Sequence, residues 1–431
     1  MMLRTHYSSE ITAKQDGKKV RVAGWLRSKR DMGKMLFLVL HDAKGDIQIT
    51  LKKDETGEKV FSTAKQLGNE DVIAINGIVK KSDSAPEGRE VVPEKIELLN
   101  KAKTPLPLDI KGHAELDTRL DHRYLDLRRP QVRAIFRVKD VVLKSFINYF
   151  DEQGFLGIQP PVIVAAATES GAALFPISYF DKEAFLAQSP QLYKQQMMAT
   201  GIDKVYIVMP VFRAEEHDTS RHLNEVIQMD IELAFVEDEE DALKHMENVI
   251  AYICQKVKDE CEKELKLLNV NLDVPKIPFK RLTYDEALKI LEKDKIKVKW
   301  GEDLPPEGER TICKHSDPVI IKKWPTDVRA FYSMPEPGNE KICRAYDLLY
   351  KGMEISSGAQ RIHKEDILIE QLKKRKMDPK NFEFYLEAFR YGMPPHAGWS
   401  IGLERLTMAI CGLKNIREAA LYPRTRTRLV P

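Results

Sequence analysis

Residues 211–234 read VFRAEEHDTSRHLNEVIQMDIELA, and this stretch sets the expectation for the rest of the chain. Two runs of apolar and β-branched residues flank a polar centre rich in Arg, His and Glu, which predicts a β-hairpin with a charged loop. Charged loops are usually solvated surfaces. Here Arg213 and Glu215 alternate with Phe212 and Ala214, so we expect the two charges on the first strand, where they need partners. A polyanionic ligand would supply such partners.

The composition is that of a large globular chain in which positive and negative charges nearly balance. The 431 residues include 69 Lys and Arg against 66 Asp and Glu, and the net charge of +3 does not by itself indicate a nucleic-acid partner. The five cysteines lack Cys-x-x-Cys spacing, which favours reduced thiols over a zinc site or a disulfide framework. The sequence has no apolar signal core and no run of about 18 apolar residues. We therefore expect a cytoplasmic protein without a membrane partner.

The N-terminal region predicts a small all-β domain. Between residues 19 and 100, five short alternating runs are separated by Gly, Asp and Lys turns, and five strands suit an OB-fold barrel. Such barrels bind single-stranded nucleic acid through basic and aromatic side chains. Arg27, Arg30, Phe37 and Gln48 offer this combination, and a core position for Phe37 is the equally weighted alternative.

Residues 101–130 contain several prolines and many charges, which is the composition of a linker. We therefore predict an OB-fold domain over residues 1–103, a hinge over residues 104–130 and an α+β domain over residues 131–431. The length is consistent with two or three domains.

The C-terminal region shows helical and strand patterns in alternation. Apolar residues four apart predict a helix from Gln131 that ends at Gly154. A second apolar stripe over residues 243–257 indicates a helix face that is buried in the core or in a subunit interface. The Lys-rich stretch 273–337 shows no pattern that indicates chemistry.

Three arginines in strand or helix-start contexts each have a carboxylate nearby. Guanidinium suits bidentate recognition of phosphate or carboxylate, although a single such pair is more often an ordinary salt bridge. The arginines are Arg213, Arg361 and Arg405, and the carboxylates are Glu215, Glu354 and Glu404.

A pair of carboxylates flanks a predicted hairpin turn. Asp347 and Glu354 lie on either side of a turn at Lys351 and Gly352. If the strands pair, both carboxylates face one cleft and suit Mg²⁺. Two unrelated surface acids are the alternative.

The chain resembles class II aminoacyl-tRNA synthetases over nearly its whole length, and among them the archaeal and eukaryotic aspartyl type. The motifs that carry the resemblance are the barrel, TRLDHRYLDLRRP at 118–130, the helix and strand ending at Pro161, Phe-Arg-x-Glu at 212–215 and GLERL at 402–406. The resemblance implies a class II catalytic domain with an antiparallel sheet flanked by helices. It also implies a homodimer that activates L-aspartate with ATP and Mg²⁺ and transfers it to tRNA(Asp).

The resemblance also implies roles for individual residues around ATP and the metal. Arg213 would bind the α-phosphate and Glu215 would orient the adenine side. The residues implied at the γ-phosphate are Arg405, Arg221 and His222. The implied Mg²⁺ ligands are Asp347, Glu354 and Ser357, and the implied catalytic residues are Arg213, Arg405 and Glu354.

The implied aspartate site is drawn from several segments. Its residues for the substrate ammonium are Glu169, Ser189, Gln191 and Asp230. Its residues for the side-chain carboxylate are Lys194, Arg361 and His396, with Ser357 also assigned to aspartate. Two cations favour aspartate over asparagine, because a neutral amide would leave desolvated charge poorly paired. An asparaginyl-tRNA synthetase and a non-catalytic tRNA-binding paralogue are the alternatives.

The barrel carries the implied anticodon contacts, which are Arg27, Arg30, Phe37, Gln48 and Pro86. Splayed anticodon bases are read by stacking and by hydrogen bonds to their edges. Relatives that are strict for the aspartate anticodon tend to carry Trp and Lys at the positions of Arg27 and Pro86. Their absence extends the expected partners to tRNA(Asn).

The chain departs from the family pattern at several single residues. Ser170, Ala172 and Ala173 replace a glycine and two polar groups in the substrate loop. Ser400 stands where many relatives have glycine, and Val226 stands where many have an aromatic residue against adenine.

Overall fold

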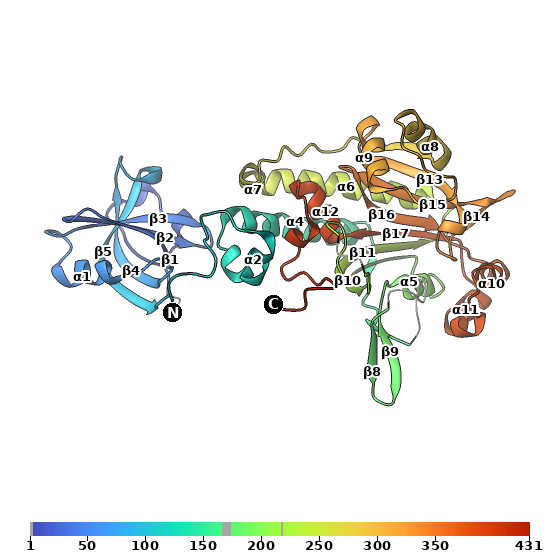
Figure 1. Cartoon of the computed structure of the whole chain (residues 1–431), viewed down its shortest axis with the longest axis horizontal. Coiled ribbons are helices and arrows are strands. Elements are labelled where there is room, and N and C mark those ends of the chain that lie inside the picture. Colours follow the sequence, from blue (N-terminus) through green and yellow to red (C-terminus); the bar gives the residue numbers. More distant parts are fainter. Residues whose placement is uncertain (1–2, 166–173, 217–218) are drawn as a thin grey trace. The chain divides into compact units, whose positions relative to one another are not determined.

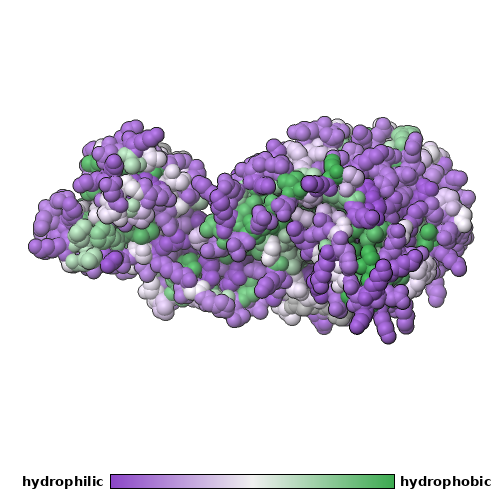
Figure 2. Space-filling model, turned by 90° about the horizontal axis from the view of Figure 1, so that it is seen from above, coloured by the Kyte–Doolittle hydropathy of each residue, from purple (hydrophilic) through white to green (hydrophobic). Residues whose placement is uncertain are grey.

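The computed structural model describes residues 3–165, 174–216 and 219–431, and it divides into two compact units, Met1–Pro107 and Leu108–Pro431. Among the described residues, no helix combines the length and the apolar character needed to cross a membrane. The face of the molecule in Figure 2 is mostly hydrophilic with smaller apolar areas, as expected for a chain in which 31% of residues are charged.

The first unit is a closed five-stranded barrel with the strand order β1–β2–β3–β5–β4. Alternate residues of β2 face the interior, where Leu36, Leu38 and Leu40 are fully buried, while Phe37 between them is only partly buried. The OB-fold prediction is confirmed. The elements are η1 (Ser8–Glu10), η2 (Ala13–Gln15), β1 (Lys19–Asp31), β2 (Met35–Asp42), β3 (Gly45–Lys52), α1 (Glu58–Gln66), β4 (Val72–Lys81), η3 (Pro86–Gly88) and β5 (Arg89–Asn100).

The second unit is built on a nine-stranded sheet with the order β12–β13–β15–β16–β17–β11–β10–β6, in which β14 also pairs with β15. The centre of the sheet is antiparallel, as expected, whereas β6 and β12 pair in parallel with β10 and β13 at the two ends. Its strands are β6 (Leu156–Gly157), β10 (Lys204–Phe212), β11 (Glu225–Ala234), β12 (Lys280–Thr283), β13 (Val319–Pro325), β14 (Pro335–Glu336), β15 (Asn339–Tyr350), β16 (Met353–Gln360) and β17 (His396–Gly402). A smaller sheet joins β7 (Ile163–Val164), β9 (Lys182–Leu186) and β8 (Pro176–Tyr179) in that order.

Helices cover the large sheet, and α6 packs along one face of it together with α4 and α12 (Figure 1). The helices are α2 (Leu116–Asp121), α3 (Arg123–Asp126), α4 (Pro130–Glu152), α5 (Gln191–Met197), α6 (Glu240–Glu260), α7 (Glu262–Leu267), α8 (Tyr284–Lys293), α9 (Pro306–His315), α10 (Glu365–Lys374), α11 (Glu383–Arg390) and α12 (Leu403–Cys411). Short 3₁₀ turns occur at η4 (Thr326–Val328), η5 (Pro379–Phe382) and η6 (Ile416–Ala419).

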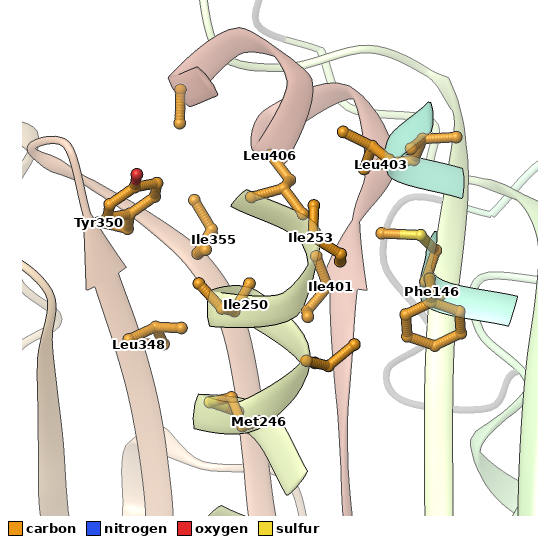
Figure 3. Packing of buried hydrophobic residues seen from close by; sticks show 14 of the residues in the cluster. Phe146, Met246, Ile250, Ile253, Leu348, Tyr350, Ile355, Ile401, Leu403 and Leu406 are labelled. Atoms are coloured by element: carbon orange, nitrogen blue, oxygen red, sulfur yellow. The ribbon is translucent and has the colours of Figure 1, made fainter. Parts of the chain in front are cut away.

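The apolar stripe of α6 lies in the core of this unit. Figure 3 shows Met246, Ile250 and Ile253 beside residues of the sheet such as Leu348 and Ile401. All of these side chains are fully buried. Of the two interpretations of the stripe, core packing is therefore the correct one.

The opening hairpin forms from β10 and β11, which pair in register from Lys204 and Leu233 to Phe212 and Glu225. The expectation that Arg213 and Glu215 lie on the first strand is wrong, because β10 ends at Phe212. The Arg213 backbone amide donates to the Asn224 carbonyl oxygen over 2.9 Å, and the Asn224 side chain donates to the carbonyl oxygens of Arg213 and Glu215 over 2.7 and 3.2 Å at the start of the loop. Both charged residues therefore project from the loop.

Candidate active site

Four central strands place polar side chains in one line across the sheet. The register pairs Asp230 of β11 with Ser400 of β17, Ser400 with Ser357 of β16, and Ser357 with Asp347 of β15. Directly opposite residues point to the same face, so the four side chains share one face of the sheet. Ser400 Oγ donates to Asp230 Oδ2 over 3.0 Å, which gives this departure from the family pattern a structural role.

A β-bulge brings Glu354 onto the same face. Glu354 lies three positions before Ser357, and in a regular strand this odd spacing would place the two side chains on opposite faces. The register shifts between Leu348 and Leu349, so that Glu354 lies opposite Leu349 and on the side of Asp347. Bulges re-aim side chains in this way beside functional sites.

A cavity of about 370 Å³ opens above this line of residues. Its size is typical of a site for a small molecule. Most of the predicted site residues line it, and they come from widely separated segments. These residues are Ser189, Gln191, Lys194, Arg213, Glu215, Arg221, His222, Asp230, Glu354, Ser357, Arg361 and Arg405.

Two other predicted residues are placed differently, and a third is not described. Asp347 is buried at the end of the line and does not line the cavity. His396 is fully buried, its ring shares a hydrogen bond of 2.9 Å with Gln195, and Gln191, which lines the cavity, donates to Gln195 over 2.8 Å. Burial lowers the pKa of His396 to about 4, so the ring adds no positive charge at neutral pH. Glu169 lies outside the described residues.

Two cations and two carboxylates form a buried network at one end of the cavity. Lys194 Nζ donates to Asp230 Oδ1 over 2.8 Å and lies 3.4 Å from Glu232 Oε2. Arg361 donates from Nε and Nη2 to the two oxygens of Glu232 over 2.9 and 3.3 Å. A ligand with its own carboxylate and ammonium could exchange partners with this network without leaving a buried charge unpaired.

The pKa values of the two acids of this network are shifted in opposite directions. Burial raises the pKa of Asp230, and the charge of Lys194 offsets this only in part. Burial also disfavours ionised Glu232, but the charges of Arg361 and Lys194 outweigh it and hold the pKa of Glu232 below its usual value. Sequence reasoning missed Glu232, although its position two residues after Asp230 on a strand was a usable signal.

The other end of the cavity is strongly basic. Arg213, Arg221 and Arg405 line it, and Arg405 Nη1 donates to the Glu354 carbonyl oxygen over 3.2 Å. His222 Nε2 lies 3.8 Å from Glu215 Oε2. Burial lowers the pKa of His222, and the three arginines lower it further. Such a cluster suits a polyanion such as a triphosphate.

The Asp347 and Glu354 pair fits a magnesium ion. Oδ1 of buried Asp347 has no hydrogen-bond partner among the described residues, while its other oxygen accepts from Arg329. Burial raises the pKa of Asp347 to about 7, with Arg329 opposing and Glu354 adding to the shift. In the described part of the chain, no group of three His, Cys, Asp or Glu residues is arranged for a metal. Two carboxylates with a hydroxyl therefore suit Mg²⁺ that keeps waters and phosphate oxygens as its other ligands.

Several lining residues come from the stretch in which no chemistry was expected. Asp303, Arg329 and Tyr332 all face the cavity, and Arg329 pairs with Asp347. They stand alone in a segment without periodicity, so no local signal marks them. The sequence shows no pattern that indicates chemistry in residues 273–337, and these three residues nevertheless line the cavity.

In the first unit, the predicted anticodon residues lie mainly on the outer surface of β1, β2 and β3. The register aligns Arg30 with Phe37, and it aligns Gln48 with Val39, two residues further along β2. Gln48 donates to Glu90 over 3.0 Å. Arg27 bonds to Asp46 over 2.6 Å at a bulge of β1, and Pro86 is exposed between β4 and β5.

Comparison with known proteins adds two family matches. The model described as tRNA synthetases class II (D, K and N) matches residues 115–426, and the OB-fold nucleic acid binding domain model matches residues 20–99. The chain is 49% identical to the aspartate–tRNA(Asp) ligase of Pyrococcus horikoshii over 100% of both chains. It is 50% identical to the aspartate–tRNA(Asp/Asn) ligase of Methanococcus aeolicus over 99% of this chain and 98% of the relative.

Solved structures show the same similarity. The asparaginyl-tRNA synthetase of Pyrococcus horikoshii, complexed with asparaginyl-adenylate, has a TM-score of 0.95 at 36% identity over 100% of both chains. The aspartyl-tRNA synthetase of Entamoeba histolytica has a TM-score of 0.90 at 31% identity, over 100% of this chain and 93% of that chain.

Proposed function

The chain belongs to the class II tRNA synthetases of the D, K and N family, and from this premise we propose that it acts as an aspartate–tRNA ligase. It activates L-aspartate with ATP to aspartyl-adenylate and transfers the aspartyl group to the 3′ end of tRNA(Asp). The observation that carries the choice of amino acid is the buried network around Lys194 and Arg361.

The network supports aspartate over asparagine on electrostatic grounds. In this proposal, Asp230 receives the substrate ammonium, and Lys194 and Arg361 receive the side-chain carboxylate. Ser189, Gln191 and Ser357 contribute hydrogen-bonding groups beside them. Asparagine would bring a neutral amide to the same cations, and the uncompensated charge in a dry site would cost several kcal/mol.

Adenylate formation requires two anions to approach each other. The α-carboxylate of aspartate attacks the α-phosphorus in line with the leaving pyrophosphate, so no protein nucleophile is needed. We propose that Arg213 stabilises the charge that builds on the α-phosphate, while Arg221, His222 and Arg405 hold the terminal phosphates. Glu215 orients the adenine side.

Asp347, Glu354 and Ser357 would hold Mg²⁺, which neutralises phosphate charge when it is bound. The unpartnered oxygen of Asp347 and the bulge that re-aims Glu354 support this assignment. In this proposal, Arg213, Arg221 and Arg405 orient the phosphates of ATP beside the residues that would hold Mg²⁺.

We propose that the barrel reads the anticodon and that tRNA(Asn) is a second substrate. The outer-face positions of Arg30, Phe37 and Gln48 support stacking and edge recognition. Arg27 and Pro86 stand where strict relatives tend to carry Trp and Lys. Full-length relatives of both kinds, the Asp and the Asp/Asn ligases, are similarly close to this chain.

We further propose a cytoplasmic homodimer. Leu156 and Ile163, which flank the proline pair Pro160 and Pro161, are 48% and 44% exposed, and a second copy would cover them. The five free cysteines are consistent with a reducing compartment.

One assay separates these functions. Aspartate-dependent ATP–pyrophosphate exchange, followed by charging of both tRNA(Asp) and tRNA(Asn) transcripts, is the expected result. Exchange with asparagine but not aspartate would instead identify an asparagine enzyme. Exchange with neither amino acid would indicate a non-catalytic tRNA-binding paralogue, and charging of tRNA(Asp) alone would exclude tRNA(Asn) as a substrate.

A further inference from the structure

Helix α9 contributes a carboxylate that lies behind the basic end of the cavity. Glu309 Oε2 accepts from Arg221 Nη1 over 2.8 Å and from the Glu354 backbone amide over 3.2 Å. The Glu309 side chain is 12% exposed and does not line the cavity, whereas Arg221 and Glu354 do. One carboxylate oxygen therefore connects α9 to the hairpin loop and to the start of β16.

The contact fixes one side of the Arg221 guanidinium. Nη1 is held by Glu309, and Nη2 donates to the Gly352 carbonyl oxygen over 3.2 Å. A guanidinium has five N–H donors, so three remain for another anion. An anchored guanidinium loses less conformational freedom when it binds phosphate than a free side chain would lose.

Two features of its surroundings oppose ionisation of the Glu309 carboxylate, and Arg221 favours it. Glu309 is a largely buried negative charge beside Glu354, and burial raises its pKa, an effect that Arg221 opposes and Glu354 reinforces. A carboxylate near a triphosphate site opposes anion binding unless it acts through a cation. The geometry meets this condition, because the guanidinium of Arg221 bonds Glu309 on one side and faces the cavity.

We propose that Glu309 is a positioning residue for ATP, which orients Arg221 toward the terminal phosphates and holds the backbone of Glu354 beside the metal site. This inference rests on the proposed function and adds a residue of α9 to it. Because Glu309 acts on the groups beyond the α-phosphate, its removal should weaken ATP binding and leave the adenylate site unchanged.

The test compares Glu309→Ala and Glu309→Gln with a matched control, Glu307→Gln, which alters an exposed carboxylate in the first turn of the same helix. The KM for ATP in aspartate-dependent pyrophosphate exchange is expected to rise roughly tenfold in Glu309→Ala, the loss expected for one charge-assisted hydrogen bond. Glu309→Gln should lie between, because its amide oxygen can accept both bonds but lacks the negative charge that strengthens the bond from Arg221. Glu307→Gln should match the unmodified chain.

A second ligand distinguishes positioning from a structural role. Aspartyl-sulfamoyl-adenosine mimics the adenylate but has no β- or γ-phosphate, so its Kd and the KM for aspartate should be unchanged in Glu309→Ala. Equal weakening of this analogue and of ATP would show general damage to the site and overturn the inference. An unchanged KM for ATP would overturn it as well.

A double variant tests the route through Arg221. If Glu309 acts through this residue, Glu309→Ala should raise the KM for ATP little further in an Arg221→Ala background. Full additivity would contradict the proposal. Absence of aspartate-dependent exchange in the unmodified chain would be a different result, which refutes the proposed function and this inference with it.

Discussion

Lys194 has the most constrained environment among the charged residues of the site. Its side chain is 1% exposed, and its ammonium group donates to Asp230 and to the backbone oxygens of Ile231 and Trp399. All three of its N–H groups therefore have partners before any substrate arrives. We propose that aspartate binding exchanges one of these bonds for a bond to the substrate carboxylate, and that the choice of amino acid therefore depends on this lysine.

Replacing Lys194 by leucine should abolish selection for aspartate. Two carboxylates would lose a buried cation, and the substrate carboxylate would lose its partner, a change worth at least roughly 3 kcal/mol. We expect kcat/KM for aspartate in pyrophosphate exchange to fall at least about 100-fold. Lys182→Leu, on the exposed strand β9, is the control, and equal exchange by Lys194→Leu and the unmodified chain would refute the role.

Arg213→Ala should stop adenylate formation without unfolding the chain. Arg213 lies in a loop and lines the cavity, so its removal leaves the core intact. A group that stabilises charge in the transition state is worth roughly 10²–10³-fold in rate. The measurements are pyrophosphate exchange and the melting temperature, with the exposed Arg390→Ala as control. Near-normal exchange in Arg213→Ala would contradict its assignment.

Among single residues, the sequence predicts the site residues that belong to a recognisable motif and misses those that lie outside any motif. Arg213, Asp230 and Arg405 belong to stretches whose pattern can be recognised, and the structure brings them to one cavity. Arg329 and Asp303 reach the same cavity from a segment without a pattern. Their position depends on strand pairings between residues far apart in the chain, which a local pattern does not contain.

Among the elements, β17 shows how close backbone approach shapes the site. A Cβ at Gly398 would overlap the Glu232 carboxylate and the Ile231 carbonyl oxygen. The Glu232 side chain therefore lies directly against Gly398 where it accepts hydrogen bonds from Arg361. At Gly402, on the same strand, the nearest atom to an added Cβ is Arg405 Cβ at 3.7 Å, which is ordinary contact.

These two glycines form a matched pair for mutation. Gly398→Ala should destabilise the chain by about 1–3 kcal/mol, because a methyl group has no room there. Gly402→Ala should leave stability nearly unchanged. Denaturant unfolding of both variants measures the difference, and equal stability would show that Glu232 can move aside without cost.

The burial of His245 on α6 should make stability depend on pH. His245 lies against Phe155, with ring centroids 5.1 Å apart, and burial lowers the pKa of His245 to about 4, with a further contribution from Lys204. An unfolded histidine titrates near pH 6.5. As the pH falls from about 6.5 to about 4, the unfolded chain takes up a proton that the folded chain does not, so the free energy of unfolding falls.

His245→Phe should therefore reduce the loss of stability between pH 6.5 and pH 4. The measurement is the free energy of unfolding at several pH values for both proteins. His396 has its pKa lowered in the same direction, so part of the pH dependence should remain in the variant. An identical slope for both proteins would contradict the assignment to His245.

Elements with long regular patterns are the ones that the sequence predicts best. The apolar spacing of α4 and α6 identifies both helices, and the turn at Lys351 and Gly352 has the positive φ angles of 52° and 77° that a tight hairpin needs. The strand before Pro160 is only two residues long, and β10 ends earlier than its alternation suggests. Pairing partners far along the chain set these ends, so local propensity does not predict them.

For the whole molecule, the sequence patterns separate the all-β region from the α+β region, and each unit has its own core. The sequence patterns do not predict which surface forms a contact between two copies of the chain. The small edge strands β6 and β7 leave apolar side chains exposed within the second unit, and a homodimer is proposed to cover them.

Ile163→Asp should weaken this dimer. The substitution places a charge in a surface that the proposed second copy desolvates. Sedimentation velocity over a range of concentrations should show a shift toward monomer. Leu98→Asp, which alters a similarly exposed leucine of the barrel, is the control, and a monomeric unmodified chain would refute the proposed assembly.

The line formed by Asp230, Ser400, Ser357 and Asp347 limits how the chain can change in length. The register of the hydrogen-bond ladder sets the face to which each of these residues points, and adding or deleting one residue turns every following side chain of that strand to the other face. Relatives should therefore differ in length in the connections between β11, β15, β16 and β17 and hardly at all within these strands. An insertion or deletion inside one of these strands would indicate a relative whose cavity has different lining residues and binds a different ligand.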